Sequence, residues 1–187
     1  MNEALAKSLG IADGSIEGLR ADIRKNLERE VKFRLQAGNK AAVMDALVAV
    51  AELDLPKSVV QSELDRLVEG ARADLKQRGI KDAEKAPIPY ELFRPQAERR
   101  VRLGLVVAEL VKANELHAKP EQIKAHIEEL AASYEKPADV IRWYQSDNRR
   151  MAEVEAIVIE NNVTEFVLSK AQVENKTVAF DELMAQS

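Results

Sequence analysis

The sequence of 187 residues contains no cysteine, which excludes disulfide bonds, thiolate nucleophiles and cysteine-ligated metal sites. Aromatic residues are also scarce, with one Trp, three Tyr and four Phe. Apolar residues nevertheless make up 46% of the chain, and 27 residues are Ala. Because Ala favours helices but buries little area per side chain, this composition is typical of slender helical layers and not of one thick core.

Neither sign of charge dominates the sequence. Charged residues make up 32% of the chain, and the formal net charge is -4. A mixed, mildly acidic surface gives no electrostatic reason to bind nucleic acid. The longest strongly apolar run, residues 103–111, is interrupted by Glu109 and is much shorter than the roughly 20 residues of a membrane-spanning helix. The first ten residues also lack the pattern of a signal peptide. We therefore expect a cytoplasmic protein with neither a nucleic-acid nor a membrane partner.

The sequence shows no recognisable catalytic or metal-binding motif. His117 and His126 are separated by Pro120, and their spacing does not place them on one face of a single helix. Glu128, Glu129 and the other acidic pairs have basic residues nearby, which is typical of ion pairs on helix surfaces. We expect no enzyme activity from this chain, no metal and no cofactor.

Apolar residues at spacings of three and four predict a series of helices. The first runs from Ile16 to about Leu53, with a weak point at Gly38. It follows residues 1–15, a glycine-containing hinge or linker that we expect to be mobile or engaged in intermolecular contacts. Further helices are predicted at 56–78, 95–114, 120–134, 137–146 and 148–171, and a final helical turn after an extended segment at 173–180. No strand pattern precedes that segment, so the predicted fold class is all-α.

The third predicted helix leaves two questions open. Its start is either Tyr90 or Pro95, because proline is tolerated in the first turn of a helix but not in its middle. Residues 101–111 are apolar nearly all round, which predicts packing on several sides. Within them, Gly104 either allows a close helix crossing or is a tolerated weak point.

Large apolar side chains gather around the predicted turn between two short helices. Leu130 and Tyr134 are four residues apart, and Val140 and Trp143 are three apart, so both pairs can face one side across the turn. Tyr144 adds a third aromatic ring. One interpretation is a small local core that holds the turn together. The other is an exposed contact surface, which on a soluble protein usually marks a binding site.

Four stretches of the sequence are similar, in order, to a known family. They are SLGIADGSIEGLRADIRKNLERE, ELFRPQAERRV, HIEELAASYEKPADVIRWY and FDELM, and they resemble the C-terminal part of bacterial trigger factor, a ribosome-associated, ATP-independent chaperone. The resemblance covers essentially the whole chain. It implies an elongated multi-helix body over residues 16–187 with two protruding helical arms, at about 56–114 and about 119–146.

The resemblance also implies a function. It predicts that the chain binds exposed apolar segments of unfolded or nascent polypeptides, assists their folding and prevents aggregation. In this reading the client-binding residues are Leu130, Tyr134, Val140, Trp143 and Tyr144. Ribosome docking and peptidyl-prolyl isomerase activity belong to other domains of the full-length family, which implies that Met1 begins a shortened form. The alternative is a helical interaction module with a fixed partner, or with a second copy in a homodimer.

Overall fold

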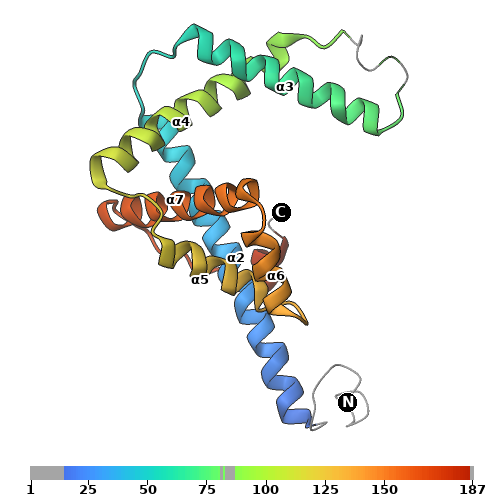
Figure 1. The fold of residues 1–187 in the computed structure, drawn as a ribbon. Coiled ribbons are helices and arrows are strands. Elements are labelled where there is room, and N and C mark those ends of the chain that lie inside the picture. The colour runs from blue at the N-terminus through green and yellow to red at the C-terminus, as the bar shows by residue number, and fades with distance from the viewer. Residues whose placement is uncertain (1–14, 81, 83–86, 186–187) are drawn as a thin grey trace. The chain divides into compact units, whose positions relative to one another are not determined.

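The computed structural model describes residues 15–80, 82 and 87–185, so the predicted hinge at 1–15 lies outside the described residues apart from Ser15. The described residues form seven α-helices and one short 3-10 helix, and none of them is in a strand (Figure 1). The all-α prediction is therefore confirmed. Internal packing divides the chain into two units, one of Met1–Ala42 with Gln172–Ser187 and the other of Val43–Ala171.

Helix α2, Ile16–Val50, starts where the sequence predicts it. The hydroxyl oxygen of Ser15 accepts a hydrogen bond from the backbone N–H of Gly18 at 3.0 Å, which satisfies one of the amide groups that a helix start leaves without a partner. The helix continues without a break through Gly38 and ends three residues before the predicted Leu53. Arg102 donates to the carbonyl oxygen of Ala51 at 2.8 Å, just beyond the helix end.

The first unit also contains the C-terminal segment. Helix α8, Phe180–Ala185, is the predicted last helical turn, and residues 172–179 before it are neither helix nor strand. Arg34 of α2 donates to the carbonyl oxygen of Met184 at 3.1 Å. Leu183 is buried, so one side of this short helix is covered.

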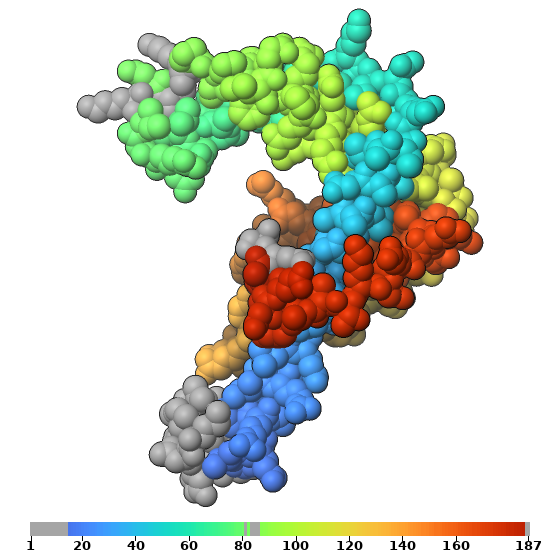
Figure 2. All heavy atoms as spheres, turned by 180° about the vertical axis from the view of Figure 1, so that it is seen from behind, coloured from blue at the N-terminus to red at the C-terminus, as the bar shows by residue number. Residues whose placement is uncertain are grey.

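In the second unit, helix α3, Lys57–Gln77, follows Pro56 and packs against α4, Arg94–Asn114. Figures 1 and 2 show the two helices in contact. Their interface is a cluster of small and branched apolar side chains, namely Val60, Leu64, Ala97 and Val101. Burial of such side chains contributes about 1.5–3 kcal/mol for each of the larger ones, so this helix pair has a core of its own.

Both expected starts of the third helix correspond to real features. Tyr90–Leu92 is a 3-10 helix, η2, and the α-helix then begins with Pro95 in its first turn. Arg94 donates two hydrogen bonds to the carboxylate of Glu91, at 2.9 and 3.1 Å. These bonds and the positive charge of Arg94 hold the pKa of Glu91 below its ordinary value. The pair links η2 to the first turn of α4.

The central segment of α4 packs on more than one side, as the sequence predicts. Val101 contacts α3 and Val111 contacts α7 and the end of α2, while Leu105 is 39% exposed. A methyl group on Gly104 would meet no atom within 4 Å, so no close helix crossing occurs there. Apolar periodicity shows which residues share a face, but not whether a neighbouring element covers that face.

The remaining helices are α5, Pro120–Ala131; α6, Pro137–Gln145; and α7, Asn148–Lys170. They pack on one another around Ile127 of α5 and Val154 and Val158 of α7. A further cluster joins α7 to α4 and to the end of α2 through Val163, Val111 and Met44. Prolines begin α5 and α6, as the sequence predicts.

Helix α5 is shorter than predicted. It ends at Ala131, and Tyr134 lies in the turn that follows, where its N–H donates to the carbonyl oxygen of Ala131 at 3.0 Å. Leu130 and Tyr134 are therefore not on one helix, and the geometric argument that paired them is wrong. Val140 and Trp143 do share α6.

Candidate functional site

The residues at the turn between α5 and α6 differ in how far they are exposed. Tyr134 is 60% exposed and Trp143 is 53% exposed, whereas Leu130, Val140 and Tyr144 are half-buried. The two aromatic side chains that face solvent are therefore Tyr134, in the turn, and Trp143, on the outer side of α6.

A local core lies beneath this turn. Ile141 and Tyr144 of α6 pack against the cluster formed by Ile127, Val154 and Val158. Because Trp143 lies between Ile141 and Tyr144 in sequence, the helical rotation of 100° per residue directs its side chain away from most of that cluster. Each of the two interpretations left open by the sequence describes some of these residues. Tyr144 belongs to the local core, and Trp143 is available for contact.

Trp143 contacts Tyr144 as well as solvent. The centroids of the two rings are 5.0 Å apart and their planes are inclined by 81°, an edge-to-face arrangement that aromatic pairs favour. Tyr144 in turn rests on the core. The exposed indole is thus supported from one side by a half-buried ring.

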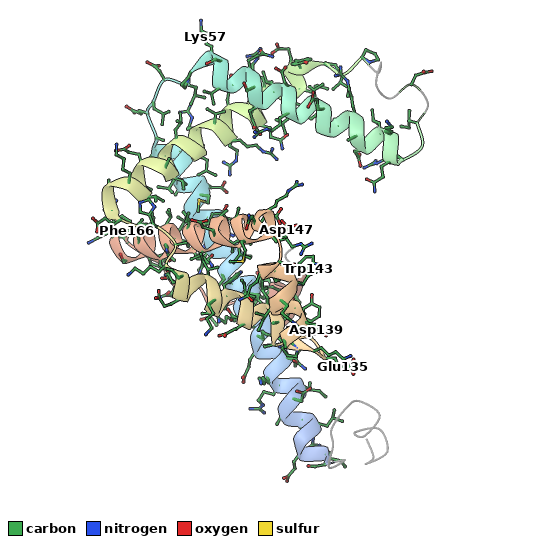
Figure 3. The ribbon with its side chains drawn as sticks, viewed as in Figure 1. Lys57, Glu135, Asp139, Trp143, Asp147 and Phe166 are labelled. Atoms are coloured by element: carbon green, nitrogen blue, oxygen red, sulfur yellow. The ribbon has the colours of Figure 1, made fainter. Side chains whose placement is uncertain are left out.

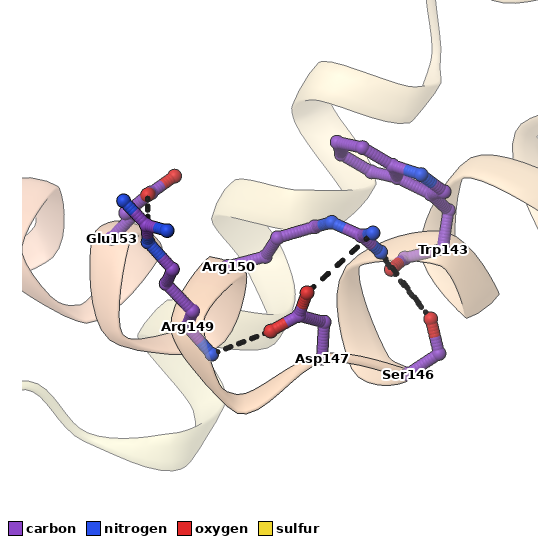
Figure 4. Close-up of polar contacts among 6 residues, drawn as sticks. All are labelled: Trp143, Ser146, Asp147, Arg149, Arg150 and Glu153. Atoms are coloured by element: carbon purple, nitrogen blue, oxygen red, sulfur yellow. Dashed lines mark hydrogen bonds and ion pairs between the residues drawn. The ribbon is translucent and has the colours of Figure 1, made fainter.

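An arginine covers a face of the same indole. The guanidinium carbon of Arg150, near the start of α7, lies 3.8 Å from the centroid of the Trp143 ring (Figure 4). This is a cation–π contact. Arg150 also donates a hydrogen bond to the backbone carbonyl oxygen of Trp143, so a single side chain binds both the ring and the main chain of this residue.

Acidic side chains flank the exposed ring at intervals of four residues. Glu135, Asp139, Trp143 and Asp147 follow one another from the turn, along α6, to the start of α7 (Figure 3). Asp139 is paired with Arg142, and Asp147 accepts a hydrogen bond from the backbone N–H of Arg149 at 2.8 Å, which caps α7. The apolar ring therefore lies within a strongly solvated surface.

Two apolar grooves lie outside the predicted site. In the first unit, Ile23, Leu27 and Val31 of α2 and Phe180 of α8 line a groove of about 580 Å³, which we call the α2–α8 groove. These three α2 residues recur at spacings of four and lie on one helix face, and Ile23 and Leu27 are exposed. A helix as long as α2 contains more apolar stripe than its neighbours can cover.

The second groove lies wholly within the other unit. Leu47 and Val50 near the end of α2 and Leu105 and Leu110 of α4 line it, and its volume is about 560 Å³; we call it the α2–α4 groove. Val50 is among the most exposed large apolar side chains of the described residues. Sequence reasoning missed this groove because it predicted that residues 101–111 pack on several sides without showing which side stays open.

The described residues offer little for catalysis or metal binding. Within residues 15–80, 82 and 87–185, no group of three or more His, Asp or Glu side chains could hold a metal ion. In the same part of the chain, no helix has the length and apolar character needed to cross a membrane. The arrangement offers apolar contact surfaces on charged helices, and this favours binding of another polypeptide.

Comparison with known proteins shows the family to which the chain belongs. Residues 15–169 match the family model described as bacterial trigger factor protein (TF) C-terminus. The chain is 79% identical over all its residues to trigger factor of Polaromonas sp. strain JS666 and 80% identical to trigger factor of Variovorax paradoxus strain S110. In both cases it spans 43% of the relative's length. The chain therefore belongs to the trigger factor family, and it corresponds to the family's C-terminal region.

Proposed function

We propose that this chain is the client-binding part of an ATP-independent molecular chaperone. It binds exposed apolar segments of unfolded or nascent polypeptides, assists their folding and prevents their aggregation. The observation that carries the proposal is that a member of the trigger factor family exposes large apolar side chains in three separate places. These are Trp143 with Tyr134, the α2–α8 groove and the α2–α4 groove.

Separate small contacts suit a chaperone that works without ATP. Each apolar patch is small, so a client segment held by one patch alone dissociates quickly. A client that reaches several patches gains from effective concentration, because its second and third contacts are intramolecular. Release needs no energy source, since the contacts open one after another. The charged residues around each patch keep the surface solvated and oppose self-association.

The arms implied by the family resemblance fit two helix pairs. We assign the first arm, about 56–114, to α3 and α4, and the second, about 119–146, to α5 and α6. The support is that α3 and α4 share the cluster around Leu64, whereas α5 and α6 are held by the cluster around Ile127. Because α3 and α4 share a core of their own, and α5 and α6 pack on the cluster that they share with α7, each pair can stay folded while its outer apolar residues contact a client.

The client-binding residues in this proposal are Leu130, Tyr134, Val140, Trp143 and Tyr144, with different roles. Trp143 and Tyr134 make the contact, because they are exposed. Leu130, Val140 and Tyr144 are half-buried, and Tyr144 supports the Trp143 ring by an edge-to-face contact. Tyr and Trp suit this role because each presents an apolar ring with a polar group at its edge.

The remaining parts of the proposal concern location and partners. We place the protein in the cytoplasm, where a chain without cysteine loses nothing from reducing conditions. Ribosome contact, in this proposal, is made by parts of the protein outside these 187 residues. Unfolded and nascent polypeptides are the direct partners of this chain.

A test of the proposal is suppression of aggregation. A chemically denatured client is diluted into buffer without ATP, and light scattering is followed with increasing amounts of the chain. We expect scattering to fall in a dose-dependent manner for several unrelated clients, and added ATP to change nothing. A dedicated interaction module would leave most clients aggregating at the control rate, and a dimerisation module would show self-association by sedimentation at micromolar concentration. Either result, without suppression, contradicts the proposal.

A further inference from the structure

Trp143 is exposed, yet its ring is held in place by a neighbouring helix. The guanidinium of Arg150 lies 3.8 Å from the ring centroid, and Tyr144 contacts the ring edge to face at 5.0 Å. About half of the residue's surface remains open to solvent. An exposed aromatic side chain on a helix surface normally samples several rotamers, so a ring with two fixed neighbours is unusual for a residue of this exposure.

Arg150 is itself anchored at the junction of α6 and α7, independently of the ring. It forms an ion pair with Asp147 at 3.5 Å, contacts the hydroxyl oxygen of Ser146 at 3.4 Å and donates to the carbonyl oxygen of Trp143. Ser146 donates to that same carbonyl oxygen at 2.9 Å (Figure 4). Asp147 is fixed in turn because it caps α7 through the N–H of Arg149.

These anchors make the guanidinium a rigid platform. A guanidinium group is planar and its charge is delocalised, so it can stack on an aromatic face while its N–H groups bind carbonyl and carboxylate oxygens. A lysine in its place would keep the charge but lose the planar stacking surface and the fork of donors. The arrangement therefore depends on arginine specifically and not on positive charge alone.

We propose that Arg150 is a positioning residue for client binding: it covers one face of the Trp143 indole, restricts the ring to one orientation and leaves the rest of the ring for an aliphatic or aromatic side chain of an unfolded polypeptide. The inference rests on the proposed function, and it adds a residue and a physical role to that site. A ring that is already ordered loses less conformational freedom when a client binds, so affinity is higher than for a freely rotating ring.

Trp143 is the one tryptophan of this chain, so its fluorescence reports on this ring alone. Time-resolved anisotropy and acrylamide quenching are measured on the free protein and on Arg150→Gln. We expect Arg150→Gln to increase the amplitude of fast ring motion and to raise the quenching constant about twofold, because one face of the indole becomes accessible. Arg150→Lys should give intermediate values, and circular dichroism checks that both variants fold.

Arg149→Gln is the matched control. Arg149 is the neighbouring residue on the same first turn of α7, and its side chain pairs with Glu153 at 3.8 Å and not with the indole (Figure 4). The substitution removes the same charge at almost the same place. Ring motion and quenching should equal those of the unchanged protein, and an equal effect of both substitutions would overturn the positioning role.

Binding is then measured with reduced and carboxymethylated ribonuclease A, an unfolded client that contains no tryptophan. We expect Arg150→Gln to weaken its affinity about three- to tenfold, with Arg149→Gln unchanged. Unchanged ring motion in Arg150→Gln, or increased motion with unchanged affinity, overturns the inference. The ring measurement is made without client, so it tests whether Arg150 holds Trp143 even if the chain binds no client and the proposed function fails.

Discussion

The side-chain amides of Gln122 and Asn162 bind each other through two hydrogen bonds. Gln122 Nε2 donates to Asn162 Oδ1 at 2.8 Å, and Asn162 Nδ2 donates to Gln122 Oε1 at 3.2 Å. Asn162 Nδ2 also lies 3.3 Å from the carbonyl oxygens of Leu116 and His117. The pair thus joins the middle of α7 to the first turn of α5 and to the loop before it.

We predict that Asn162→Ala lowers the free energy of unfolding by about 1–2 kcal/mol, because part-buried carbonyl and amide groups lose their partner. The two side chains should also be coupled. In a double-mutant cycle with Gln122→Ala, the interaction free energy should be on the order of 0.5–1 kcal/mol. Chemical denaturation of the four proteins measures it, and additive effects within experimental error would show that the amide pair does not join the helices.

The two glycines at 79 and 104 should respond oppositely to alanine. Gly79 has a φ of 76° and closes α3, where its N–H donates to the carbonyl oxygen of Lys76 and the N–H of Ile80 donates to that of Leu75, a Schellman motif. Gly79→Ala should therefore destabilise by about 1–2 kcal/mol. Gly104 is inside α4 with free space around it.

Gly104→Ala should stabilise the chain by about 0.5–1 kcal/mol, because Ala has the higher helix propensity and nothing obstructs its methyl group. Thermal melts of both variants check the pair of predictions. Destabilisation by Gly104→Ala would mean that this face of α4 is covered in solution, as in the close helix crossing that the sequence left open.

Helix boundaries were largely predictable from the sequence, because local chemistry sets them. Pro56, Pro120 and Pro137 begin helices at the expected places, and Gly79 ends one. The end of α5 was not predictable. Neither glycine nor proline lies between Ala131 and Tyr134, and Pro137 is too far along the chain to block a helix at Tyr134 by its ring.

Exposure was less predictable than helix position, for a physical reason. Spacing shows that Trp143 and Tyr144 point in different directions on α6, but only the packing of α6 on α5 and α7 determines which of them faces the core. The same holds for Leu105, because the apolar residues around it in the sequence do not show which side of α4 stays open. Arg150 was missed as a site residue because the end of α6 and the start of α7 both lie between it and Trp143.

Trp143→Ala should separate binding from stability. Trp143 is half exposed, so we expect the free energy of unfolding to change by less than about 1 kcal/mol, while client affinity falls several-fold. Ile127→Ala is the matched comparison, because Ile127 is 2% exposed beneath the same turn and its truncation should cost about 2–5 kcal/mol. A loss of 3 kcal/mol or more for Trp143→Ala, with unchanged affinity, would assign Trp143 to the core.

The 187 residues on their own should not catalyse prolyl isomerisation. They match the C-terminal region of the family, and the resemblance assigns isomerase activity to another domain. The isomerisation rate of a proline-containing test peptide should equal the uncatalysed rate. Uncatalysed isomerisation takes roughly tens to hundreds of seconds at 25 °C. An acceleration that survives repurification of the chain and scales with its concentration would contradict this.

The central claim is that this chain binds many unfolded polypeptides through exposed apolar side chains, and affinity across a panel of clients tests it most directly. Three unrelated proteins kept permanently unfolded by chemical modification are titrated, each alongside its native form. We predict micromolar dissociation constants for all three unfolded forms, no measurable binding of the native forms, and several-fold weaker binding of all three by Trp143→Ala. Tight binding of one client with none of the others, or equal binding of native and unfolded forms, would contradict the account.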